Sequence, residues 1–180
     1  AFQVLTQEGF LKTRPNSGFV VSQVSRQDVE NIFQVRLELE ALATRQAVRR
    51  MTDADIDVLE NLVVRMEQYI ESQDYHAYWL DNRVWHFELY KHCGNDVLIR
   101  LLTEMFDYSR RYPAYYTRQE ELGNSVDEHY QIVDALRKRN AELAEAYIRS
   151  HTIETKYHYI RRVEEMIAQS AQTQGGEHED

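Results

Sequence analysis

Residues 125–152, SVDEHYQIVDALRKRNAELAEAYIRSHT, predict two amphipathic helices joined at a break near Asn140. His129 leads the apolar stripe of the first helix and His151 follows that of the second, so both histidines face the core. The stripes are Ile132, Val133 and Leu136, then Leu143, Tyr147 and Ile148. Each histidine lies 11 residues from Asn140. An antiparallel pair of helices therefore places them level, about 16 Å from the turn.

The chain from residue 25 to about residue 170 carries the same helical periodicity. SRQD at 25–28, TDAD at 52–55 and SVDE at 125–128 read as helix starts, as do Asp74 and Asn140. The expected helices span 25–51, 53–72, 75–94, 95–113, 125–139 and 141–170. Their expected inward stripes include Ile32, Val35, Leu39 and Leu42 in the first helix and Ile56, Leu59, Val63 and Met66 in the second. The pattern predicts an all-α fold.

Residues 1–24, AFQVLTQEGFLKTRPNSGFVVSQV, predict a separate small unit. A helix stops at Gly9, a strand begins at Phe10, PNSG forms a turn, and a second strand runs through Val24. The chain begins in a helical pattern without methionine, so we expect this helix to have lost its beginning. The predicted parts are this helix end with its β-wing (1–24), a helical domain (25–170) and a disordered acidic tail (171–180).

Composition and charge restrict the function. The net charge is -9, but residues 1–24 hold Lys12 and Arg14 against Glu8 alone. The helical body should therefore repel phosphate, and any contact with nucleic acid belongs to the front end. The chain has no apolar run of membrane-spanning length and no secretory signal, which predicts a cytoplasmic protein without a membrane partner. The single Cys93 excludes an internal disulfide.

The stretch DNRVWHF, residues 81–87, places Asn82 and His86 four residues apart. On a helix these two lie within about 40° of each other, whereas Asp81 is about 140° away from His86. His129 and His151 are two inward histidines at equal depth, and His86 of the Asn82–His86 pair is a third. A divalent metal in a helical bundle requires such a set of ligands. The alternative is that each imidazole is satisfied separately by Glu or Tyr neighbours.

Four segments, in this order, resemble one known family. AFQVLTQEGFL with RPNSGFVV resembles the end of a recognition helix with its wing, and IFQVRLELEALATRQAV resembles the first helix of an effector domain. NRVWHFELYKHCGNDVLIRLL resembles a D-x-x-x-H motif, and DEHYQIVDALRKRNAELAEAYIRSH resembles a segment with paired histidines. The family is the GntR-type transcriptional regulators of the FadR-like group, whose effector-binding module is the FCD domain.

The resemblance implies an antiparallel bundle of six to seven helices behind a winged helix-turn-helix, in a homodimer that binds palindromic operator DNA. It implies that residues 1–24 are the C-terminal part of that DNA-binding domain. Lys12 and Arg14 would then meet phosphates, and Gly18 would permit a close approach to the minor groove. The main base-reading residues would lie upstream of Ala1.

The resemblance also carries a metal site over to Asn82, His86, His129 and His151. The first position is commonly aspartate, and the neutral oxygen of Asn82 is a weaker ligand. A zinc or nickel ion held there would bind a small carboxylate effector. Arg36 would be a second, bidentate donor to that carboxylate, unless it forms a plain surface pair with Glu40.

We expect a ligand-responsive regulator and not an enzyme, because no Ser, Cys or acid stands in a nucleophile or general-base motif near the histidines. Two alternatives stay open. The first is a metal-dependent helical enzyme, because three histidines around an open metal position also describe such sites. The second is a metal-free ligand-binding or dimerisation module with a structural polar core.

Overall fold

The computed structural model describes residues 2–7, 11–14, 18–21, 25–109 and 119–175. The front unit consists of α1 (Phe2–Gln7), β1 (Leu11–Arg14) and β2 (Gly18–Val21). The helical domain consists of α2 (Arg26–Val48), α3 (Asp53–Glu71), α4 (Tyr75–Tyr90), the 3-10 turn η1 (Lys91–Cys93), α5 (Asp96–Ser109), α6 (Gln119–Arg137) and α7 (Ala141–Gly175). The all-α prediction is confirmed, with six α-helices in this domain among the described residues.

The helix starts follow the local capping signals. Ser25 and Thr52 each form a full capping box, with Asp28 and Asp55 as their reciprocal partners. Asp74 caps α4 by accepting from the amide of Ala77 at 3.0 Å. These caps depend only on neighbouring residues, which is why the sequence predicted them.

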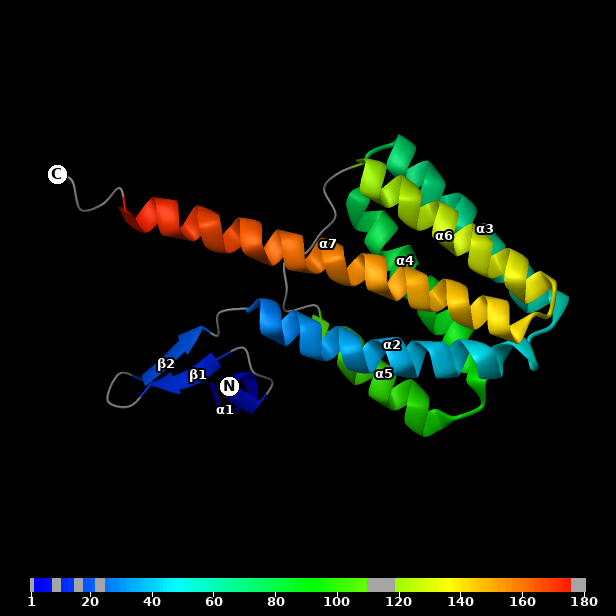
Figure 1. Ribbon diagram of the computed structural model, residues 1–180, viewed down its shortest axis with the longest axis horizontal. Helices are drawn as coiled ribbons and strands as arrows, with labels where there is room; N and C mark the ends of the chain where they lie inside the picture. The colour runs from blue at the N-terminus through cyan, green and yellow to red at the C-terminus, as the bar shows by residue number, and fades with distance from the viewer. Residues whose placement is uncertain (1, 8–10, 15–17, 22–24, 110–118, 176–180) are drawn as a thin grey trace.

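Figure 1 shows α2 and α7 lying side by side as the long axis of the domain. α4 and α6 both pack against α3, α6 also packs against α7, and α5 packs against α2. The main core lies between these helices and includes Trp85, Leu59 and Ile132, all fully buried. Ile56, Leu59, Val63 and Met66 are all fully buried, as their spacing predicts.

A second, smaller core joins the first half of α2 to the second half of α7. Its buried members are Val29, Ile32, Phe33, Tyr159, Ile160 and Val163. It extends the α2–α7 pair toward the end of the domain from which the front unit departs (Figure 1). α2 therefore runs from the front unit through this cluster into the main core.

The two strands that the sequence predicts in the front unit are present. β1 and β2 pair antiparallel, with Leu11 opposite Val21 and Arg14 opposite Gly18. The rings of Phe2 and Phe19 stack at 5.1 Å and so connect α1 to the hairpin. The predicted stop at Gly9, the turn at residues 15–17 and the strand ends at Phe10 and Val24 lie outside the described residues.

Three sequence predictions about helices are wrong in detail. α6 begins at Gln119, so SVDE at 125–128 lies inside this helix and does not start it. Leu122 is fully buried, and this tertiary burial favours helix through Gly123 despite the glycine. α7 continues to Gly175, five residues into the expected tail, and 176–180 lie outside the described residues. The helix expected over 95–113 is present as Asp96–Ser109, and residues 110–113 lie outside the described residues.

The third error concerns the inward face of α2. Val35 is 47% exposed, and Leu39 and Leu42 are only partly buried. The positions that face inward instead include Arg36 and Glu40. Hydrophobic periodicity counts apolar residues only, so it cannot detect a face that carries buried charges. Among the described residues, no helix is long and apolar enough to span a bilayer.

Candidate metal centre

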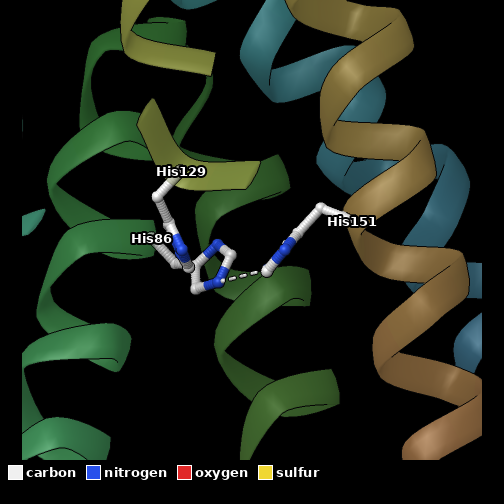
Figure 2. A group of neighbouring side chains, drawn as sticks. All are labelled: His86, His129 and His151. Carbon is white, nitrogen blue, oxygen red and sulfur yellow. Dashed lines mark hydrogen bonds between the residues drawn. The ribbon is translucent and has the colours of Figure 1, made fainter. Parts of the chain in front are cut away.

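Three histidines from three helices meet in the main core. His86 comes from α4, His129 from α6 and His151 from α7, and Figure 2 shows their rings turned toward one another. All three residues are buried. The ring centroids of His129 and His151 are 4.6 Å apart, which confirms that the two lie level. One ligand atom from each of the three histidines lies within 4.8 Å of the others.

Two of these histidines have their tautomers set by acceptors. The Nδ1 of His129 lies 2.5 Å from the backbone oxygen of Ser125, and the Nδ1 of His151 lies 2.7 Å from Oε2 of Glu128. A carbonyl or carboxylate oxygen can only accept, so in both rings Nδ1 carries the proton. The lone pair of Nε2 is left to face the centre.

The tautomer of His86 is set through a second residue. Its Nδ1 lies 3.0 Å from the Tyr90 hydroxyl, and that hydroxyl donates its proton to Oε2 of Glu40 at 2.6 Å. A hydroxyl has one proton, so the Tyr90 oxygen accepts from His86. The Nδ1 of His86 is therefore protonated, and Nε2 is again the free nitrogen.

The environment keeps two of these rings, those of His86 and His129, in the form that binds metals. Burial, with added contributions from His151 and His129 and from Arg36, lowers the pKa of His86 well below its usual value. Burial, followed by His151, likewise lowers the pKa of His129. His86 and His129 are therefore neutral near pH 7, as a metal ligand must be.

The convergence of the nitrogens requires a positive species between them. Nε2 of His151 lies 3.3 Å from Nε2 of His86 (Figure 2), and two lone pairs at that distance repel unless a proton or a metal ion lies between them. A proton there would leave Nε2 of His129 without a partner, and this atom is buried and has none among the described residues. A metal ion would satisfy all three nitrogens.

Asn82 fits the fourth ligand position. It lies one turn before His86 on α4, and its Oδ1 is buried with no hydrogen-bond partner among the described residues. Asp81 instead pairs with Arg65 at 2.7 Å, so it is turned away from the centre, as its angle on the helix predicts. The residues present therefore fit a divalent ion with imidazole and amide donors.

Arg36 lies beside the centre and is buried. Its Nε donates to Oε1 of Glu40 at 2.8 Å, and its Nη1 donates to Oγ of Ser109 at 3.2 Å. The guanidinium carbon stands 3.8 Å from the ring centroid of Phe106, whose ring is 5.5 Å from that of His86. The pair with Glu40 that the sequence offered as an alternative is therefore present, but it is not at the surface, because the Arg36 and Glu40 side chains are only 6% and 1% exposed.

The sequence did not assign a role to Glu40, Tyr90 or Glu128. Glu40 follows Arg36 by four residues, and Tyr90 follows His86 by four residues, so helical spacing offered a signal for both. Glu128 reaches His151 from the neighbouring helix. Only the packing of α6 against α7 brings those two together.

The chemistry of the centre is that of a binding site. Both carboxylates beside it, Glu40 and Glu128, are already hydrogen-bonded acceptors. Among the described residues, the site shows no nucleophile paired with a base. The predicted DNA contacts Lys12, Arg14 and Gly18 lie on β1 and β2 of the front unit, whereas the histidines lie on α4, α6 and α7. Gly18 has a left-handed backbone, with φ of 82°.

Comparison with known proteins gives a family match and curated relatives. A family model described as the FCD domain matches residues 31–154. The HTH-type transcriptional repressor GlaR of Escherichia coli is 25% identical over 162 residues, which cover 85% of this chain and 74% of GlaR. The HTH-type transcriptional regulator YdhC of Bacillus subtilis is 23% identical over 162 residues, which cover 84% of this chain and 68% of YdhC.

Solved structures share the fold. The structure of McbR/YncC from Escherichia coli superposes with a TM-score of 0.74, covering 91% of this chain and 81% of that one at 20% identity. The structure of Lar, described as controlling expression of the agr system of Listeria monocytogenes, superposes with a TM-score of 0.70 at 19% identity, covering 88% of this chain and 76% of that one.

Proposed function

Because the chain belongs to the FCD domain family and is a GntR-type transcriptional regulator, we propose that its helical domain senses a small carboxylate through a divalent metal ion. His86, His129, His151 and Asn82 would hold the ion. The observation that carries the proposal is the convergence of three Nε2 atoms whose Nδ1 partners are already in place. Metal-binding histidines in proteins are oriented in this way by acceptors on the other nitrogen.

The donor set favours a transition metal such as zinc or nickel, because imidazole suits these ions better than it suits magnesium or calcium. Once bound, such an ion supplies a Lewis acid that attracts a carboxylate oxygen. Arg36 would orient the effector from α2 as a planar, permanently charged donor. Phe33 and Phe106 flank its guanidinium, at 4.6 and 3.8 Å, and keep it in place.

Effector binding would act on DNA through α2. This helix carries Arg36 and Glu40, and its N-cap Ser25 lies four residues after the last residue of β2. In a homodimer, a shift of α2 would change how two winged helices fit half-sites about 34 Å apart on a palindromic operator. Lys12 and Arg14 would contact phosphates, and Gly18 would allow close approach to the minor groove. A protein that binds operator DNA would work in the cytoplasm.

Metal content tests the proposal directly. We expect about one equivalent of zinc or nickel per chain in protein purified without chelator or histidine tag. His129→Ala should lose this metal while helical content by circular dichroism stays intact. His76→Ala is the matched control, because His76 is exposed on α4. Wild-type protein that takes up neither ion at micromolar concentrations contradicts the proposal.

The proposed binding of a carboxylate through the metal ion is tested by a metal-dependent response to carboxylates. Acetate, lactate, malate and citrate should be compared for thermal stabilisation of the metal-loaded protein and of the metal-free protein. We expect at least one of them to stabilise only the loaded form, and Arg36→Met to weaken that stabilisation. Equal stabilisation with and without metal would favour the metal-free binding module, in which the acceptors on Nδ1 simply satisfy the imidazoles.

A further inference from the structure

We propose that Tyr90 and Glu40 are the positioning pair for His86, and that they supply the centre with negative charge that Asn82 lacks. This inference rests on the proposed metal site and concerns which residues of this chain tune it. Neither Tyr90 nor Glu40 would touch the ion. Both would act through the imidazole of His86.

The pair is placed by helix geometry. Asn82, His86 and Tyr90 follow one another at intervals of four on α4 and therefore share one face of the helix. The Tyr90 hydroxyl lies 3.0 Å from Nδ1 of His86 and 2.6 Å from Oε2 of Glu40. The three residues form a continuous chain from a carboxylate on α2 to the imidazole, and all three are buried.

The two oxygens of Glu40 have different partners. Oε1 accepts from Nε of Arg36 at 2.8 Å, while Oε2 accepts from Tyr90 and, more weakly, from Thr152 at 3.4 Å. A carboxylate that only neutralised Arg36 would not need the tyrosine. The pairing with Arg36 holds the Glu40 side chain in place, so that it acts as a fixed acceptor for Tyr90.

The arrangement would supply negative charge close to the ion. Imidazole and amide ligands bring no negative charge to a divalent ion in a buried site, and such an uncompensated charge is costly. His151 is backed directly by Glu128 at 2.7 Å, and His86 is backed by Glu40 through Tyr90. Each carboxylate makes its imidazole a stronger donor. In this chain the carboxylates of Glu40 and Glu128 thus lie behind the histidine ligands. A carboxylate ligand would instead bring its negative charge directly to the ion.

Tyr90→Phe tests the pair because it removes a single oxygen and keeps the ring. We expect zinc and nickel affinity, measured by competition with a chromogenic chelator, to fall about 10- to 100-fold. Tyr130→Phe is the matched control: its hydroxyl also donates to a carboxylate, Glu67 at 3.2 Å, but this hydrogen bond is exposed and does not involve a histidine. That control should bind both metals as the wild type does.

Ring tautomers in metal-free protein give a readout that needs no ion. In two-bond proton–nitrogen correlation spectra, we expect His86 to be protonated on Nδ1 in wild type and in Tyr130→Phe. In Tyr90→Phe it should move toward the Nε2 tautomer, because the acceptor on Nδ1 is gone. A purely structural role for Tyr90 would leave this tautomer unchanged.

Glu40→Gln separates charge from hydrogen bonding, because its amide oxygen can still accept from Tyr90. We expect the His86 tautomer to be retained and metal affinity to fall. If Tyr90→Phe alters neither affinity nor tautomer, the positioning pair is overturned while the metal site stands. If wild type binds metal but Glu40→Gln binds it equally well in folded protein, the charge contribution is overturned. If wild type binds no metal, both the site and the pair are overturned.

Discussion

Glu40→Leu should be among the most damaging single substitutions in the helical domain, even though glutamate is ordinarily a surface residue. The Glu40 side chain is 1% exposed and bonds Arg36, Tyr90 and Thr152. Leucine keeps most of the volume but leaves the Arg36 guanidinium buried opposite an apolar side chain. Arg36 cannot lose its charge near neutral pH.

The magnitude follows from the partners that remain. Removing one member of a buried ion pair costs about 3–5 kcal/mol, because the other charge stays desolvated. The Tyr90 hydroxyl also loses its acceptor, a penalty of the order of 1–3 kcal/mol that overlaps with the first. We expect a total loss of about 4 kcal/mol. Domains of this size are stable by about 5–15 kcal/mol, so the loss is a large fraction of the free energy of unfolding.

Urea denaturation in the presence of EDTA measures this loss without any contribution from bound metal. Glu38→Leu is the matched control on the same helix: Glu38 also pairs with an arginine, Arg149 at 2.9 Å, but its side chain is 66% exposed. That control should unfold at nearly the wild-type urea concentration, because water solvates the arginine when the partner is removed.

The double variant Arg36→Met with Glu40→Leu distinguishes the unpaired charge from lost packing. We expect it to recover most of the stability lost by Glu40→Leu alone, because no charge is then left buried. A loss below about 1 kcal/mol for the single variant would show that no uncompensated charge is left buried. So would a double variant no more stable than the single one.

Further predictions concern the ion and the course of α6. Asn82→Asp should raise zinc affinity at least about tenfold in chelator competition, because a carboxylate replaces a neutral amide oxygen; unchanged affinity would place residue 82 away from the ion. Zinc at 100 times its dissociation constant should stabilise the protein by about 2.7 kcal/mol in thermal unfolding, and EDTA should reverse this, whereas His129→Ala should show neither effect. Gly123→Ala should stabilise the fold by about 0.5–1 kcal/mol in urea, because Gly123 lies inside α6 and an added Cβ meets no atom within 4 Å; destabilisation would indicate that the helix does not begin at Gln119.

The elements that the sequence predicts correctly in this protein are those controlled by local interactions. The caps at Ser25, Thr52 and Asp74 bond to amides three residues away, so neighbouring residues in the sequence are enough to predict them. The predicted start of α6 is wrong, because SVDE at residues 125–128 has the capping-box pattern but lies inside a continuous helix. There the burial of Leu122, which depends on neighbouring helices, extends the helix upstream.

The same distinction between local and tertiary interactions applies to the candidate centre. Equal spacing of His129 and His151 from Asn140 determined their level, because an antiparallel helix pair converts distance along the chain into depth. Helical spacing also determined that Asn82 and His86 share a face while Asp81 does not. These inferences need only the rise and turn of an α-helix.

Only the tertiary structure decided which atoms of these side chains meet. The bonds of Glu40 to Tyr90 and of Glu128 to His151 join residues 50 and 23 positions apart, and they set which nitrogen of His86 and of His151 is free. Helical spacing alone left Arg36 either as a donor to the effector or as a surface partner of Glu40. The packing of α5 and α7 buries both side chains, and burial changes the contribution of their ion pair from negligible to several kcal/mol. Spacing along one helix determines direction, but the packing of several helices determines distance, solvent exclusion and tautomer, and the binding properties of the centre depend on these.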